Sequence, residues 1–219
     1  MSLYSFYRIS KPSEAKVPED RVDGTYKSLR NRTFWGVTMA YGLYYVCRMS
    51  LSVIKQPLID EGVLTAGQLG LVGSALLFVY AVGKFLNGFI ADYCNIRRFM
   101  ATGLLLSSVA NLLMGLLGLF HGSYGLPQVV ILMSFAFLWG ANGWMQSMGA
   151  PPGVISLSRW FPQSKRGTWY GIFSASPYLG ETLSFIATAA VVGAFGWQYG
   201  FISAAVAGFV GSAVILLFV

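Results

Sequence analysis

The chain has 219 residues, of which 55% are hydrophobic and 11% are charged, and its mean hydropathy is +0.61. A soluble domain carries about 25% charged residues, so this composition excludes an ordinary soluble protein and indicates a membrane protein. The net charge of +7 requires no nucleic-acid partner, because it follows from an uneven placement of basic residues around the predicted spans.

Six apolar segments are each long enough to cross a bilayer, which takes about 20 helical residues. Their apolar runs are continuous rather than alternating, which argues against the strands of a barrel. The sequence therefore predicts an all-α polytopic membrane protein with six transmembrane helices. The predicted spans are 34–54, 66–90, 99–120, 128–148, 168–194 and 199–219.

Residues 1–33 are polar and lack the apolar centre of a secretory signal peptide, so we expect a cytoplasmic tail and insertion directed by the first span. The tail and the loops after the second and fourth spans carry twelve basic residues, whereas the opposite loops carry only Lys55. The positive-inside rule then places both termini of this segment in the cytoplasm. The twelve are Arg8, Lys11, Lys16, Arg21, Lys27, Arg30, Arg32, Arg97, Arg98, Arg159, Lys165 and Arg166.

Arg48 is the first charge that the predicted spans place at membrane depth. It lies about 21 Å along the helix from Phe34, at roughly 1.5 Å per residue, which is too far for easy snorkelling to the cytoplasm. Partial snorkelling to the outer boundary is the alternative. Tyr41, Tyr45 and Arg48 are spaced i, i+4 and i+7, so they share one face of the helix.

The second span carries a similar pair, Tyr80 and Lys84, four residues apart. An ionisable group at membrane depth costs at least about 2.5 kcal/mol and is a functional-site candidate by default. A guanidinium offers a planar fork, an ammonium a point charge and phenols further donors, a combination that suits an oxyanion. We therefore predict an anion site built on Arg48 and Lys84. The alternative is that the two cations pair with carboxylates inside the bundle.

Glu181, in the fifth span, is a carboxylate at similar depth. It can satisfy at most one of the two cations well, which leaves a positive charge for a ligand. One hypothesis is that Glu181 neutralises Lys84 or Arg48 when the site is empty and is displaced by substrate. Proton coupling is the other, because desolvation raises the pKa of a carboxylate.

Local features are also predicted along the chain. Thr65 is an N-cap candidate for the second span, with Gln68 to complete a capping box. His121 is expected in a solvated loop after the third span. The fourth and fifth spans are rich in small residues that allow close helix approach, as in residues 140–153, and Pro151 and Pro152 should terminate or kink the fourth span. Pro177 should bend the fifth span and free a backbone carbonyl.

The sequence predicts neither a disulfide bond nor a catalytic site. Cys47 lies in a span and Cys94 in a predicted cytoplasmic loop, so we expect no disulfide. The sequence shows no catalytic nucleophile, metal-ligand cluster or nucleotide-binding loop, so we expect neither an enzyme nor a cofactor or metal.

The segment "NGFIADYCNIRR", residues 87–98, resembles the loop between the second and third helices of the major facilitator superfamily. The resemblance implies a cytoplasmic latch between two halves of a transporter, formed here by Gly88, Asp92, Arg97 and Arg98. The alternative is a polar turn that only follows the positive-inside rule.

A closer resemblance is to the organophosphate:phosphate antiporters, which include glycerol-3-phosphate and hexose-phosphate transporters. It rests on "YGLYYVCR" (41–48), "YAVGKF" (80–85), "GWMQSMGAPPG" (143–153) and "RWFPQSKRGTWYG" (159–171), and it covers nearly all of the chain after residue 25. It implies that the first-helix arginine grips the substrate phosphate and that a lysine and tyrosines line the same cavity. By position these residues are Arg48, Lys84, Tyr41, Tyr45 and Tyr80, with Gln146 as a weaker candidate.

Three features depart from that family pattern. Met49 follows the arginine where a basic residue is common, and Ala150 stands where a bulky residue is common. In the fifth span the segment "FSASPYLGE" lacks a histidine and an asparagine of the usual cavity. The residues implied to bind phosphate are all present. The departures concern the recognition of the organic part of the substrate and the coupling of transport.

The family has twelve helices in two six-helix halves around a central site. With six predicted spans, we expect residues 34–219 to form the N-terminal half and a C-terminal six-helix half to be required for activity. A natural half that pairs with a second chain is the alternative.

The resemblance implies a bacterial inner-membrane transporter that exchanges a phosphorylated organic solute for inorganic phosphate by alternating access. The solute would be a sugar phosphate, glycerol phosphate or phosphoglycerate. One alternative is a membrane sensor of sugar phosphate that signals to a partner kinase. Another is a structural membrane protein whose buried charges only pair with one another.

Overall fold

The computed structural model describes residues 6–10 and 16–219, so part of the predicted tail, residues 1–5 and 11–15, lies outside it. After a short 3-10 turn, η1 (Glu19–Arg21), seven helices follow: α2 (Val22–Asp60), α3 (Ala66–Tyr93), α4 (Ile96–Tyr124), α5 (Gln128–Ser147), α6 (Ala150–Trp160), α7 (Gln163–Phe195) and α8 (Trp197–Phe218). Six stretches in the described ranges are long and apolar enough to cross a membrane, with α5 and α6 together forming one of them. The predicted all-α fold with six membrane helices is confirmed.

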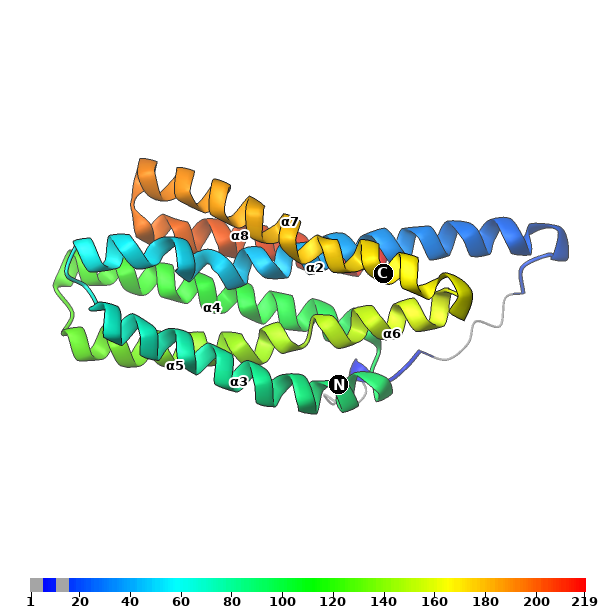
Figure 1. The fold of residues 1–219 in the computed structure, drawn as a ribbon, viewed down its shortest axis with the longest axis horizontal. Helices are drawn as coiled ribbons and strands as arrows, with labels where there is room; N and C mark the ends of the chain where they lie inside the picture. Colours follow the sequence, from blue (N-terminus) through cyan, green and yellow to red (C-terminus); the bar gives the residue numbers. More distant parts are fainter. Residues whose placement is uncertain (1–5, 11–15) are drawn as a thin grey trace.

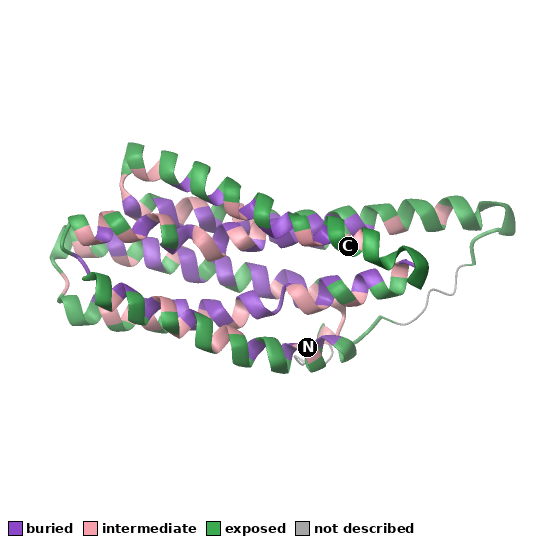
Figure 2. Ribbon diagram, in the orientation of Figure 1, coloured by how far each residue is buried: buried purple, intermediate pink, exposed green. Residues whose placement is uncertain are grey.

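The first helix is longer than the sequence indicates. α2 begins at Val22 rather than at Phe34, and its first turns project from the bundle and are exposed (Figure 2). A change in hydropathy marks where a span enters the membrane, but it does not end a helix. The backbone ladder continues through residues 22–33 because no proline interrupts it.

The fourth predicted span breaks near its end. α5 stops at Ser147, and the chain re-enters a helix at Ala150. Pro151 and Pro152 lie in the first turn of α6, where a missing N–H breaks no hydrogen bond of the helix. The prolines therefore begin a new helix after a kink, in agreement with the expected interruption.

Successive membrane helices run in alternating directions (Figure 1). The connections α2–α3, α4–α5 and α7–α8 gather at one end of the bundle, and the connections α3–α4 and α6–α7 lie at the other. We call the first group the outer end and the second the inner end, after the orientation that the basic residues predict. α2 packs mainly on α7 and α8, and α3 mainly on α5, while α2 and α3 barely touch each other.

Two glycines allow the closest helix crossings. A side chain at Gly180 in α7 would collide with the carbonyl of Gly42 in α2, and one at Gly143 in α5 would collide with the backbone of Leu76 in α3. The prediction that small residues in the fourth and fifth spans permit close approach is thus confirmed at these positions.

Replacing Gly180 with valine should destabilise the bundle, because the group that the new side chain meets is backbone and cannot move aside. Overpacking of this kind costs about 1–3 kcal/mol or more. The thermal unfolding temperature of the purified protein measures the effect. Gly193→Val in the same helix is the matched control, because nothing lies within 4 Å of a side chain there. Equal stability of the two variants would contradict the crossing.

Three local predictions can be compared with the structure. The capping box of Thr65 and Gln68 is present at the start of α3. Pro177 lies inside α7, and the carbonyl it frees, that of Phe173, accepts a hydrogen bond from Ser176 Oγ at 2.8 Å. The loop position expected for His121 is wrong, because this residue lies within α4 and is half-buried.

The described N-terminal segment folds back onto the inner end. The backbone N–H of Asn95 donates to the carbonyl of Tyr7 at 2.7 Å, and Arg98 Nη1 donates to the carbonyl of Phe6 at 2.7 Å. The guanidinium of Arg98 also lies 5.2 Å from the centre of the Phe6 ring. Partial burial at this junction raises the pKa of the Cys94 thiol. The tail therefore packs against the loop that the sequence singles out.

Candidate anion-binding site

The central cluster lies between α2 and α3. The guanidinium carbon of Arg48 lies 4.3 Å from the centre of the Tyr80 ring and 5.4 Å from that of Tyr45. Lys84 Nζ lies 5.6 Å from the same Tyr80 ring. Each contact is within cation–π range, which contributes about 0.5–2 kcal/mol depending on exposure. The structure thus brings together four residues that the sequence assigned to one site.

No carboxylate in the described part of the chain neutralises this cluster. Within residues 6–10 and 16–219 one ion pair is closer than 4.0 Å, between Arg21 and Asp20. Because Arg48 and Lys84 face one ring, their charges are roughly 10 Å apart at most, and at that distance they repel by about 1.7 kcal/mol at an effective dielectric constant of 20. An anion about 4 Å from either cation would gain about 4 kcal/mol at the same dielectric constant. The internal-pairing alternative finds no support in this arrangement.

Tyr41 lies behind the cluster rather than in its centre. Its ring is 8% exposed and stacks on Phe173 of α7 at 4.9 Å, and its edge-to-face partner is Tyr45 at 5.6 Å. Tyr41 therefore packs against Tyr45, the residue that contacts Arg48. A direct contact of Tyr41 with substrate stays a prediction.

Gln146 belongs to a buried polar network inside the bundle. Its Nε2 donates to Ser107 Oγ at 2.7 Å, and Ser107 Oγ donates to Asn142 Oδ1 at 2.6 Å. The side-chain nitrogen of Asn142 is buried and has no partner among the described residues. Gln146 thus ties α5 to α4, and its role as a cavity residue remains a prediction.

Asn111 of α4 is a residue that the sequence did not single out, and it holds α2 where Arg48 projects. Its Nδ2 donates to the carbonyl of Cys47 at 3.0 Å, and its Oδ1 accepts from Ser50 Oγ at 2.7 Å. A second bond runs from Nδ2 to the carbonyl of Ser107 at 3.0 Å. Arg48 lies in sequence between Cys47 and Ser50, the two residues to which this fully buried amide bonds, so we predict that Asn111 positions the guanidinium.

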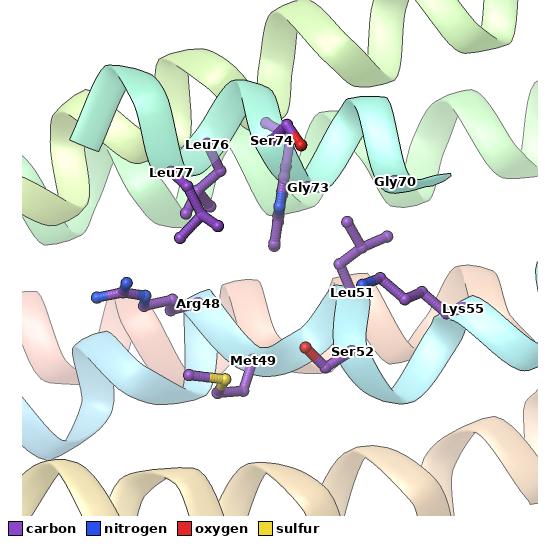
Figure 3. A pocket seen from close by; sticks show the side chains of 11 residues that line it. Arg48, Met49, Leu51, Ser52, Lys55, Gly70, Gly73, Ser74, Leu76 and Leu77 are labelled. Atoms are coloured by element: carbon purple, nitrogen blue, oxygen red, sulfur yellow. The ribbon is translucent and has the colours of Figure 1, made fainter. Parts of the chain in front are cut away.

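A cavity of ≈ 290 Å³ opens beside Arg48 where α2 and α3 separate. Figure 3 shows Arg48 and Lys55 projecting from α2, with Gly70 and Gly73 on the facing wall of α3. Lys55 is the second cation that lines this cavity, although the sequence places it only among the outer loops. Its position seven residues after Arg48 puts both on one helix face, a signal that the sequence did contain.

The remaining predicted residues lie apart from the cluster. Glu181 in α7 is half-buried and has no basic group within 4.0 Å among the described residues, so its part as a coupling residue or charge partner stays a prediction. At the inner end Gly88 lies in α3, Asp92 and Arg97 are exposed, and Arg98 contacts the tail. Their latch role also stays a prediction.

Comparison with known proteins identifies a family and several similar proteins. Residues 37–219 match the Major Facilitator Superfamily. A probable hexose phosphate transport protein of Chlamydia pneumoniae is 34% identical over 189 residues, which are 85% of this chain and 39% of that protein. A glycerol-3-phosphate transporter of Haemophilus influenzae is 35% identical over 169 residues, covering 77% of this chain and 34% of the relative.

Another relative is a sensor protein rather than a transport protein. The membrane sensor protein UhpC of Salmonella typhimurium is 29% identical over 194 residues, which are 88% of this chain and 41% of that protein. The chain therefore spans about two-fifths of the length of these relatives.

Solved structures show the same fold. The crystal structure of a bacterial homolog of the human lysosomal transporter Spinster, inward-facing and unoccupied, superposes with a TM-score of 0.72. The match covers 88% of this chain and 43% of that one, at 17% sequence identity. At this identity the likeness concerns the arrangement of helices alone.

Proposed function

The chain belongs to the major facilitator superfamily, and on that premise we propose that it forms the phosphate-binding half of a secondary transporter. The transporter would exchange a phosphorylated organic solute, such as a sugar phosphate, glycerol phosphate or phosphoglycerate, for inorganic phosphate. The superfamily is one of transporters, so the chain is not an enzyme. Its six membrane-capable helices and its relatives make it a multi-pass bacterial membrane protein.

One observation carries the proposal: Arg48 and Lys84 face one tyrosine ring at a membrane depth where no carboxylate accompanies them in the described chain. Two such cations repel each other, and an anion between them would replace that repulsion with two attractions. A phosphate group accepts a bidentate bond from the guanidinium of Arg48 and a further bond from the ammonium of Lys84. Tyr45 and Tyr80 flank the charges.

A second six-helix half would complete the site. The chain spans about two-fifths of the relatives' length, and within the cluster Lys84 is exposed and Arg48 is half-buried. We propose that the other half closes this side and supplies a second phosphate-gripping arginine. In this proposal the inner end lies in the cytoplasm of a bacterial inner membrane, and Gly88, Asp92, Arg97 and Arg98 latch the two halves there.

Exchange would follow from unequal binding in two states. A ligand shifts a conformational equilibrium only by the difference in its affinity for the two conformations. A phosphate held by Arg48, Lys84 and a cation of the other half lowers the energy of a closed, occupied state in which the halves can rock. An empty site keeps its charge repulsion, so the empty carrier would rock slowly and obligate exchange would result.

A sensor of sugar phosphate that signals to a partner kinase is the second candidate. It is favoured by the 29% identity to the membrane sensor protein UhpC, which covers most of this chain. The sensor would bind its ligand through Arg48 and Lys84 without carrying it across the membrane. Binding alone therefore does not separate the two functions, whereas transport does.

The test uses the complete protein that contains this chain, reconstituted into liposomes loaded with inorganic phosphate. Labelled external phosphate should enter by exchange, and glycerol phosphate, hexose phosphate or phosphoglycerate should compete according to affinity. The competition profile names the substrate class. Phosphate-ester binding without exchange would favour the sensor, and neither binding nor exchange would overturn the proposal.

A further inference from the structure

A cation outside the proposed phosphate grip points into the cavity between α2 and α3. The cavity of ≈ 290 Å³ is lined by Arg48 toward the middle of α2 and by Lys55 toward its outer end. Small-molecule sites begin at about 300 Å³, so this cavity is close to the lower limit for such a site. Figure 3 shows the Lys55 side chain extending from α2 beside Leu51, toward α3.

Two glycines contribute to the wall of the cavity on the α3 side. Gly70 and Gly73 of α3 line the cavity, and the ammonium of Lys55 is the nearest group to a side chain built at Gly73, at 3.9 Å. Gly70 has open space around the corresponding position. Because neither glycine has a side chain, space remains between α2 and α3, and a ligand can lie there next to the ammonium of Lys55.

The two acidic residues that follow Lys55 in the sequence form hydrogen bonds with other residues. Asp60 Oδ1 accepts a hydrogen bond from Gln56 at 2.8 Å, and Glu61 Oε2 accepts one from Trp197 Nε1 at 2.8 Å. Neither lies within 4.0 Å of Lys55, which has no hydrogen-bond or ion-pair partner in the described part of the chain. A half-buried ammonium in a cavity that also holds Arg48 has its strongest available partner in an anion.

We propose that Lys55 is a second phosphate contact, on the outer side of Arg48. It holds the phosphate group of a solute that enters or leaves at the outer end, before Arg48 and Lys84 bind it or after they release it. The inference rests on the proposed function for the identity of the anion and for the orientation of the chain. The placement of Lys55 on the same face as Arg48 and closer to the outer end supports this order of contacts.

The experiment measures equilibrium binding of labelled inorganic phosphate to the complete purified protein. Arg48→Gln should weaken binding strongly but leave a residual component, and the double variant Arg48→Gln/Lys55→Gln should lose it. Lys55→Gln alone should weaken binding about fivefold, as expected for a half-exposed charge contact. Lys55→Arg keeps the charge and should retain the affinity. Lys165→Gln, an exposed lysine at the inner end, is the control for net charge.

Exchange in phosphate-loaded liposomes, measured on the same variants, separates this inference from the proposed function. A higher KM for external phosphate in Lys55→Gln, with an unchanged maximal rate, supports the inference. Wild-type affinity and KM in Lys55→Gln, with exchange still dependent on Arg48, would overturn it and leave the proposed function standing. Lys55-dependent phosphate binding without exchange would support the contact and contradict the transporter. A wild-type protein that binds no phosphate would overturn both.

Discussion

Arg48→Gln is expected to abolish phosphate exchange while the protein remains folded. The substitution removes a bidentate, charge-assisted contact, and the loss of one partner from a desolvated charge pair costs about 2–5 kcal/mol. At about 1.4 kcal/mol per factor of ten, phosphate affinity should fall by about 100-fold or more. Arg48→Lys keeps the charge but loses the planar fork, so it should recover only part of the affinity.

The measurement is exchange of labelled phosphate together with thermal unfolding of each variant. Arg159→Gln is the matched control, because this arginine is exposed at the inner end and removing it takes the same charge from the chain. Stability should change little in Arg48→Gln, because the loss of the cation–π contacts with Tyr45 and Tyr80 is offset by the loss of the repulsion from Lys84, and no carboxylate partner is left behind among the described residues. Wild-type exchange by Arg48→Gln would show that the guanidinium is not required for phosphate binding and would contradict the proposed site.

The paired substitution Lys84→Met with Glu181→Leu separates the anion site from a structural charge pair. If the charges only neutralise each other, the double variant keeps the properties of the wild type. If Lys84 binds phosphate, its loss alone weakens phosphate binding, and removing Glu181 as well does not restore it. Phosphate affinity of the two single variants and the double variant distinguishes these outcomes, and we expect the second.

Asn111→Ala should lower both stability and phosphate affinity. The amide makes three buried hydrogen bonds, two of which hold the backbone and side chain of α2 on either side of Arg48. Interhelical hydrogen bonds in membrane proteins average about 0.6 kcal/mol and reach about 1.7, so the loss of the two that join α4 to α2 costs about 1–3 kcal/mol. A displaced guanidinium should also raise the phosphate dissociation constant by about tenfold.

The two effects of Asn111→Ala are measured by thermal unfolding and by phosphate binding at a temperature where the variant is folded. Ser212→Ala is the control, because Ser212 is also buried but bonds only to the carbonyl of Gly208 in its own helix. A purely structural role for Asn111 predicts a lower unfolding temperature with an unchanged dissociation constant. That result would contradict its role in positioning Arg48.

The cluster of Arg48 with tyrosines could be predicted because helical spacing is a local property. Residues three or four apart share a face whatever the rest of the fold does, so Tyr45 with Arg48 and Tyr80 with Lys84 follow from the sequence. That the two pairs meet across α2 and α3 came from the resemblance and from the topology of a helix bundle, not from spacing. Lys55 also shares a helix face with Arg48, but the predicted span ended at residue 54, so Lys55 was assigned to the outer loop.

Asn111 could not be identified in this way. Its partner Cys47 is 64 residues away, and an asparagine in a span gives no sign of which helix it faces. The start of α2 at Val22 and the position of His121 inside α4 were missed for another reason. Hydropathy reports where a chain meets the membrane boundary, whereas a helix ends where its hydrogen-bond ladder ends.

Binding of a phosphate group between Arg48 and Lys84 underlies every functional proposal for this chain, and a structure of the complete protein with bound phosphate would show it or exclude it. We expect phosphate density within about 3 Å of the Arg48 guanidinium and the Lys84 ammonium, with Tyr45 and Tyr80 flanking it. Density at another site, or a carboxylate closing on both cations in the presence of saturating phosphate, would rule out this mode of binding.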